Sequence, residues 1–165
     1  MLTHLLLMRH AKSSWTSDAA TDHQRPLNDR GRRSAPAIGA ALHARGYAPD
    51  TIWSSDSKRT RETAMHLIRA IPGAQTVHYA TEFYHASPSD VIQYARKQGE
   101  PDAQRLMWLG HNPGWSELYH LFAGRPHRFP TAACAVFERR RDGDWLDPDQ
   151  WRPIDLLLPR DIVAD

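Results

Sequence analysis

A short apolar run near the amino terminus, Leu5-Leu6-Leu7-Met8, constrains the fold more than any other stretch of the chain. A continuous apolar run of this length predicts a strand buried on both faces, which is typical of parallel sheets covered by helices. The run stops at Arg9-His10, and ligands of open α/β sheets bind beyond the carboxyl ends of the strands. Arginine can hold a phosphate and a neutral imidazole can act as nucleophile or base. Taken alone, residues 5–12 fit two interpretations equally well: a functional site at Arg9-His10, or a strand that simply ends in solvent.

Beyond this run, strand-like and helix-like segments alternate, which predicts a three-layer α/β/α sandwich with a mostly parallel central sheet. The predicted strands cover about residues 3–9, 51–53, 76–79, 105–109, 133–139 and 151–157. The predicted helices cover about residues 29–45, 58–71, 88–98 and 115–122. We expect the last two strands to pair antiparallel at the sheet edge, on either side of Asp142-Gly143. Pro36 conflicts with the first helix, so either that helix kinks there or its regular part begins at Ser34.

The length and composition favour one ordinary globular domain. With 165 residues, 41% of them hydrophobic, we expect a single domain over residues 1–165. A net charge of +2 argues against nucleic-acid binding, and the run Arg139-Arg140-Arg141 is expected to lie exposed beside a hairpin turn. No stretch approaches the ~18 apolar residues of a membrane span, and the amino terminus lacks the features of a signal peptide. The single cysteine, Cys134, excludes an internal disulfide and is expected in the core, so we expect a cytoplasmic protein.

Three of the predicted strand ends carry similar chemistry. Arg9 and His10 follow the first strand, and His111 follows the fourth. A serine-rich turn after the second strand opens a helix whose first turn holds Arg59, and helix amino termini favour anions. Each motif alone fits a solvated loop or helix face. Because the carboxyl ends of parallel strands meet at one sheet edge, the three motifs together predict a pocket for a dianion.

These motifs resemble those of the histidine phosphatase superfamily, which contains the phosphoglycerate mutases, and within it the small SixA-type phosphohistidine phosphatases. Arg9-His10-Ala11 is similar to the family's Arg-His-Gly motif, and His111 matches its second histidine. Residues 25–31 resemble the family's Arg-Pro-Leu-Thr segment, and residues 54–64 resemble its Ser-Ser-Pro … Arg-Ala … Gln-Thr-Ala helix. The matches cover about residues 3–115 in the family order, and no long insertion follows the second helix, as in the SixA group. The resemblance implies a phosphoglycerate mutase-like fold.

The resemblance also implies a metal-independent phosphatase that works through a covalent intermediate. His10 would attack phosphorus as a neutral imidazole, and water would then hydrolyse the phosphohistidine. Arg9, Arg59 and His111 would hold the phosphoryl oxygens. The flanking cations would keep His10 neutral near pH 7. Since fixed side chains would handle the phosphoryl charge, we expect no metal and no other cofactor, and no His, Cys, Asp or Glu cluster has metal-ligand spacing.

The sequence indicates the proton donor for the leaving group less clearly than it indicates the nucleophile and the phosphate-binding residues. Glu82 follows a predicted strand end and resembles the family's acid in position, although an exposed loop carboxylate is nearly as good an explanation. A phosphohistidine substrate would need the acid less, because a protonated imidazole is already a good leaving group. Ser13, in the polar loop after the first strand, is a candidate substrate contact. Weaker candidates for the acid or the pocket mouth are Asp18, Asp22, His78 and His85.

The sequence departs from the family pattern at two positions and does not identify the substrate, so three functions remain open. Ala11 places a methyl group where the family has glycine, and Asp56 replaces a proline and is expected to alter only the turn. The leading hypothesis is a phosphatase whose partner is a phosphohistidine-bearing protein. A pocket closed by the loop 13–22 would instead suit a small phosphoester, such as a sugar or nucleotide phosphate. The third hypothesis, favoured by Ala11, is a catalytically silent phosphate-binding scaffold; the sequence leaves the oligomeric state open.

Overall fold

The computed structural model describes residues 1–163, and within them six strands form one sheet in the order β3-β2-β4-β1-β5-β6. The strands are β1 (His4–Arg9), β2 (Thr51–Ser55), β3 (Thr76–Ala80), β4 (Arg105–Gly110), β5 (Cys134–Arg139) and β6 (Trp151–Leu157). The helices are α1 (Asp29–Ala44), α2 (Lys58–Arg69), α3 (Pro88–Gln98), α4 (Gly114–Ala123) and α5 (Pro159–Ile162). Strands β1 to β4 are parallel, whereas β5 runs antiparallel to both β1 and β6. The predicted mostly parallel α/β sheet with an antiparallel edge pair is confirmed.

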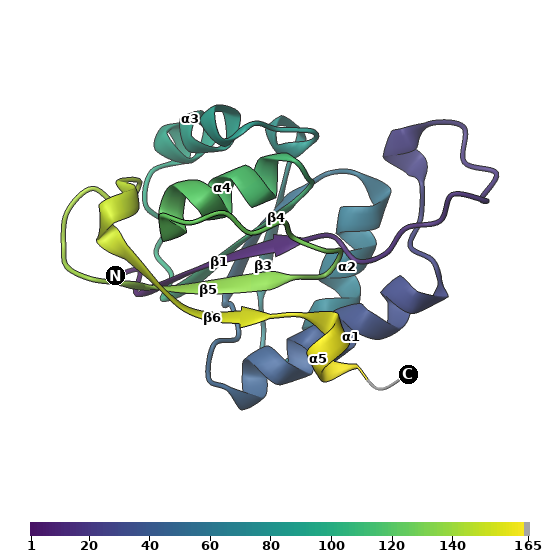
Figure 1. The fold of residues 1–165 in the computed structure, drawn as a ribbon, viewed down its shortest axis with the longest axis horizontal. Helices are drawn as coiled ribbons and strands as arrows, with labels where there is room; N and C mark the ends of the chain where they lie inside the picture. The colour runs from purple at the N-terminus through teal and green to yellow at the C-terminus, as the bar shows by residue number, and fades with distance from the viewer. Residues whose placement is uncertain (164–165) are drawn as a thin grey trace.

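The apolar run of β1 is continuous because its alternate side chains are buried in two different cores. Leu5 and Leu7 belong to the cluster that α3 and α4 cover, together with Trp108 of β4. Leu6 and Met8 belong to the cluster that α1 and α2 cover. Figure 1 shows the same division, with α3 and α4 on one face of the sheet and α1 and α5 on the other. Among the described residues, no helix is both long and apolar enough to cross a membrane.

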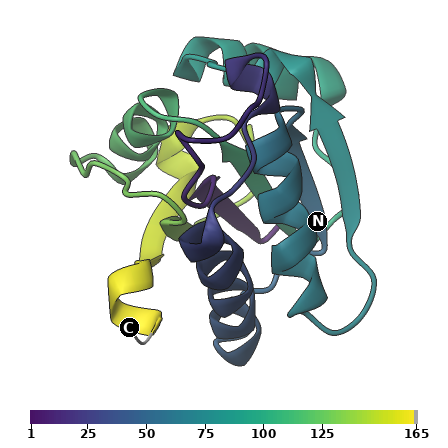
Figure 2. The ribbon, with the colours of Figure 1, turned by 90° about the vertical axis from the view of Figure 1, so that its right-hand side faces the viewer.

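The carboxyl ends of β1, β2 and β4 lie at one edge of the sheet. The parallel register places Arg9 of β1 opposite Gly110 of β4, and Ser54 of β2 opposite Leu109. In Figure 2, which faces this edge, the loop of residues 11–28 lies in front of the sheet. The three predicted motifs are therefore delivered to the same end of the molecule, beneath one loop.

The first helix begins where the sequence predicts but continues through its proline. The Asn28 side chain accepts a hydrogen bond from the Gly31 amide and caps α1. The helix is uninterrupted across Pro36, so the alternative in which its regular part begins at Ser34 is wrong. A Cβ atom at Gly31 would overlap the carbonyl of Lys12, so glycine allows the loop after β1 to cross closely over the first turn of α1.

The basic run near the carboxyl terminus is only partly exposed, which corrects the sequence prediction. The Arg139 side chain is 7% exposed, and its guanidinium donates to both carboxylate oxygens of Glu100 at 3.1 Å. Arg140 and Arg141 are exposed as expected. The apolar stem of arginine can be buried when its charged end is paired, and Arg139 thereby ties the end of β5 to the segment between α3 and β4. Cys134 is fully buried in β5, as predicted.

Candidate active site

His10 stands directly after β1 in a geometry that fixes its protonation. Its Nδ1 lies 2.7 Å from the backbone oxygen of Ala11. A carbonyl oxygen can only accept a hydrogen bond, so the proton is on Nδ1 and the Nε2 lone pair is free. Burial lowers the pKa of His10 to about 3, the hydrogen bond to Ala11 opposes this, and the charges of Arg59 and Arg9 lower it further. His10 is therefore neutral near pH 7, mainly through burial rather than through its flanking cations.

Ala11 fits the position of the family glycine without distortion. Its side chain is fully buried in the core that α1 and α2 cover, and its backbone is outside the left-handed region. The Ala11 amide donates to the hydroxyl of Thr63 at 3.0 Å, and that hydroxyl donates to the carbonyl of Arg59 at 2.7 Å. Helix α2 therefore holds the backbone segment that in turn orients His10.

His111 follows β4 and faces His10, with 5.3 Å between the ring centroids. Its Nε2 lies 2.8 Å from the hydroxyl oxygen of Ser55, which also accepts the Ser57 amide at 3.3 Å. Among the described residues, His111 Nε2 is the one acceptor within reach of the Ser55 hydroxyl hydrogen, which leaves the His111 proton on Nδ1. Burial lowers the pKa of His111 to about 2, with further contributions from His10 and Arg59. His111 is thus a neutral donor whose Nδ1–H is available.

Arg9 and Arg59 bring permanent charge beside the two imidazoles. The Arg59 residue is 2% exposed, and Arg9 donates through Nη1 to the carbonyl of Phe129 at 2.9 Å. Burial, followed by the charges of Arg128 and Arg59, lowers the pKa of Arg9. Within residues 1–163, the buried nitrogens Arg9 Nε, Arg59 Nε and His111 Nδ1 have no hydrogen-bond partner. Unpaired buried donors are costly, and the acceptor oxygens of an anion are the kind of partner that these three nitrogens lack.

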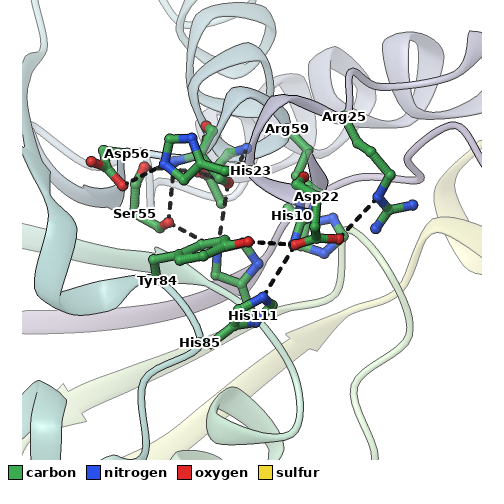
Figure 3. A network of polar contacts seen from close by, with 12 residues as sticks. His10, Asp22, His23, Arg25, Ser55, Asp56, Arg59, Tyr84, His85 and His111 are labelled. Atoms are coloured by element: carbon green, nitrogen blue, oxygen red, sulfur yellow. Dashed lines mark hydrogen bonds and ion pairs between the residues drawn. The ribbon is translucent and has the colours of Figure 1, made fainter. Parts of the chain in front are cut away.

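Asp22, from the loop over the sheet edge, lies at the centre of a polar network (Figure 3). Its Oδ2 accepts hydrogen bonds from Arg59 Nη2 at 3.0 Å, the Tyr84 hydroxyl at 2.5 Å and His85 Nε2 at 3.1 Å. Its Oδ1 accepts from Arg25 Nε at 3.1 Å. Burial opposes ionisation, but the hydrogen bonds from Tyr84 and Arg59 outweigh it and hold the pKa of Asp22 well below its usual value. Sequence reasoning ranked Asp22 low because its partners come from distant segments.

Asp56 does more than alter the turn after β2. One carboxylate oxygen lies 2.9 Å from His23 Nε2, in the loop over the site, and the other accepts from the Thr81 hydroxyl at 2.9 Å. The residue that replaces the family proline therefore ties this loop to the segment after β3. The expectation that Asp56 changes only the turn is wrong.

The remaining predicted site residues lie outside this network. Ser13 is buried and pairs with Leu27 through an isolated β-bridge, and its hydroxyl makes no hydrogen bond within residues 1–163. Glu82 is exposed and lines a separate groove beside α3. His78 lines a separate hollow together with Thr51 and Trp53 of β2, whereas His85 does reach the site, where it contacts Asp22. The roles predicted for Ser13 and Glu82 stay predictions that this geometry does not favour.

The chain is similar to several known proteins. The sequence profile described as histidine phosphatase superfamily (branch 1) matches residues 5–84. An uncharacterised chloroplastic protein of Arabidopsis thaliana is 32% identical over 142 residues; the match covers 81% of this chain and 65% of that protein, so the chain spans about two thirds of this relative. An uncharacterised protein of Mycobacterium tuberculosis is 34% identical over 151 residues, which is 85% of this chain and 90% of that protein.

The solved structures with similar folds point the same way. A candidate phosphohistidine phosphatase, SixA, from Agrobacterium tumefaciens has a TM-score of 0.80 at 31% identity, covering 96% of this chain and 99% of that one. A protein histidine phosphatase SixA complexed with tungstate has a TM-score of 0.79 at 17% identity, over 96% of this chain and 98% of that one, which supports the fold alone.

Proposed function

The chain belongs to the histidine phosphatase superfamily, in its SixA-type group, and we propose that it is a metal-independent phosphatase that acts through a phosphorylated His10. The observation that carries the proposal is the state of His10 itself. Its Nδ1 proton is committed to the Ala11 carbonyl, so the Nε2 lone pair is free beside the unpartnered donors of Arg9, Arg59 and His111. A buried neutral imidazole next to fixed N–H donors is what a nucleophile for phosphoryl transfer requires.

The reaction proceeds in two displacements at phosphorus. In the first, the Nε2 lone pair of His10 forms the new P–N bond while the bond to the leaving group breaks with its electron pair. Arg9, Arg59 and His111 donate hydrogen bonds to the equatorial oxygens, where charge is spread in the transition state. In the second, water attacks the phosphorus of phospho-His10, releasing inorganic phosphate and regenerating the imidazole. The side-chain donors supply the positive charge that a metal supplies in other phosphatases.

The leading substrate is phosphohistidine carried on a protein. The likeness to SixA structures supports it. A histidine side chain also extends far enough from its own backbone to bring a phosphoryl group to the buried His10. The loop of residues 11–28, which lies over the carboxyl ends of the strands (Figure 2), favours the second candidate, a small phosphoester. Rates on a phosphorylated histidine-containing domain and on a panel of sugar and nucleotide phosphates separate the two.

The silent-scaffold alternative loses its main support at Ala11. The methyl group that suggested it is buried in the core, and the Ala11 carbonyl orients His10 as the proposed chemistry needs. Tight binding of phosphate or vanadate without turnover of any phosphoester or phosphoramidate would nevertheless establish that alternative.

A trapping experiment tests the proposal directly. The protein is mixed with labelled phosphoramidate, quenched rapidly in alkali, and examined by mass spectrometry for alkali-stable, acid-labile phosphate. We expect label on His10 that is absent from His10→Ala and retained in a variant of an exposed histidine, His43→Ala. Bound phosphate with no label on His10, or full phosphatase activity in His10→Ala, would overturn the covalent mechanism.

A further inference from the structure

The Asp22 carboxylate lies in the network around His10, yet the two displacements proposed above do not use it. Arg59 is shared between two tasks: Nη1 and Nη2 donate to the Asp22 backbone oxygen at 2.8 Å and to its carboxylate at 3.0 Å, whereas Nε is unpartnered within the described residues. One guanidinium can therefore hold a phosphoryl oxygen through Nε and Asp22 through its outer nitrogens. In this arrangement Asp22 and a phosphoryl group would bind different nitrogens of Arg59.

Asp22 lies on the side of the pocket from which a leaving group departs. His10 is 6% exposed, whereas the Asp22 side chain is 43% exposed and meets Tyr84 and His85 at the pocket mouth. In an in-line displacement the leaving group lies opposite the nucleophile. Since the buried His10 attacks from inside the protein, the leaving group points outward, which is the side on which the more exposed Asp22 carboxylate lies.

The hydrogen bonds of Asp22 decide what it can do there. Hydrogen bonds from Tyr84 and Arg59 keep the carboxylate ionised, so it cannot give a proton to an alcohol leaving group. Among residues 1–163, its Oδ1 accepts one hydrogen bond, from Arg25, and a carboxylate oxygen has room for a second. Asp22 can thus accept one more hydrogen bond, which suits a leaving group that carries its own N–H. Its negative charge would repel the negative charge that develops on an alkoxide leaving group.

We infer that Asp22 is a specificity-determining residue that accepts a hydrogen bond from the N–H of an imidazole leaving group and so selects phosphohistidine over alkyl phosphates. The inference rests on the proposed function and names the substrate class of the same site. In the first displacement, the electron pair of the breaking P–N bond goes to the leaving ring nitrogen. The other ring nitrogen already carries the hydrogen that it donates to Asp22 in a hydrogen bond. The ring therefore departs as neutral imidazole, and Asp22 transfers no proton to it.

The test compares two substrates in wild type and in Asp22→Ala. One is a short peptide whose histidine has been phosphorylated with phosphoramidate; the other is p-nitrophenyl phosphate, whose leaving group needs no proton and has no N–H. We expect Asp22→Ala to lower kcat/KM for the peptide by roughly 10- to 100-fold more than for the aryl ester, the factor of one charged hydrogen bond. Asp22→Asn should show a smaller loss, and Asp142→Asn, at an exposed aspartate after β5, should show none.

Vanadate binding distinguishes this role from a structural one. In the inferred role Asp22 contacts the leaving group and not the phosphoryl oxygens, so Asp22→Ala should bind vanadate at least as tightly as wild type. If Asp22→Ala lowers kcat/KM equally on both substrates and weakens vanadate binding, Asp22 only positions Arg59. If it raises kcat/KM on both substrates, Asp22 only blocks access to the site. Either result overturns the inference. Wild-type protein that cleaves the aryl ester but no P–N bond would overturn both the proposed substrate and the role of Asp22, so the two failures are distinguishable.

Discussion

Two buried neutral histidines should make the protein markedly less stable in mild acid. Burial lowers the pKa of His10 to about 3 and that of His111 to about 2, from an ordinary value of 6.5. At pH values between the lowered pKa values and 6.5, these histidines bind protons in the unfolded chain but not in the folded chain. The free energy of unfolding therefore falls as the pH falls below 6.5. Both groups are below 7% exposed, so solvent screening does not discount the effect.

The size of the effect between pH 7 and pH 5 follows from the unfolded state alone. At pH 5 both native imidazoles are still neutral, so the cost is that of the protons bound by the unfolded histidines, about 2 kcal/mol each. For His10 and His111 together we expect the free energy of unfolding to be about 4 kcal/mol lower at pH 5 than at pH 7. Urea unfolding in phosphate-free buffer at the two pH values measures it.

Variants isolate the two histidines from other titrating groups. The double variant His10→Gln/His111→Gln has no imidazole at either position and should lose most of the difference between pH 7 and pH 5. His43→Gln, at an exposed position on α1, should retain it. A wild-type protein equally stable at both pH values, or a double variant that keeps the full difference, would refute the argument that these imidazoles are buried and neutral.

Two further predictions concern the groups that orient the imidazoles. Thr63→Val leaves the buried Ala11 amide without its acceptor and should lower the free energy of unfolding by about 1–3 kcal/mol, measured by urea unfolding; an unchanged midpoint would contradict it. Ser55→Ala removes the hydroxyl that fixes the proton of His111 on Nδ1 and should lower kcat/KM by roughly 10- to 100-fold. Full activity in that variant, with vanadate binding intact, would show that Ser55 does not set the tautomer.

The sheet and the motifs at its edge could be predicted because they depend on local patterns. The run Leu5 to Met8 is apolar at every position, so only a strand covered on both faces satisfies it. Arg9 is the last residue of such a strand, His10 and His111 each directly follow one, and parallel pairing brings the three to the same end of the sheet. Asn28 predicted the start of α1 because a helix cap is a contact within four residues.

The groups that the sequence analysis missed or ranked low make contacts between distant segments. Asp22 meets Arg59, Tyr84 and His85, which are 37, 62 and 63 residues away along the chain. Arg139 lies in a run that looks solvated, yet its partner Glu100 is 39 residues away. No periodicity or spacing signals such pairs, because a long loop allows its side chains many partners until the fold selects one.

The sequence by itself determined the chemistry available at the sheet edge: two imidazoles, two guanidiniums and the order in which they arrive. Residue identity and strand position suffice for that, since each is a property of a few neighbouring residues. Only the tertiary structure decided that burial is the main reason His10 is neutral, that its proton is on Nδ1, and that Asp22 is the anion bonded to Arg59. Protonation depends on burial and on charges from all surrounding segments, and those exist only once the chain has folded.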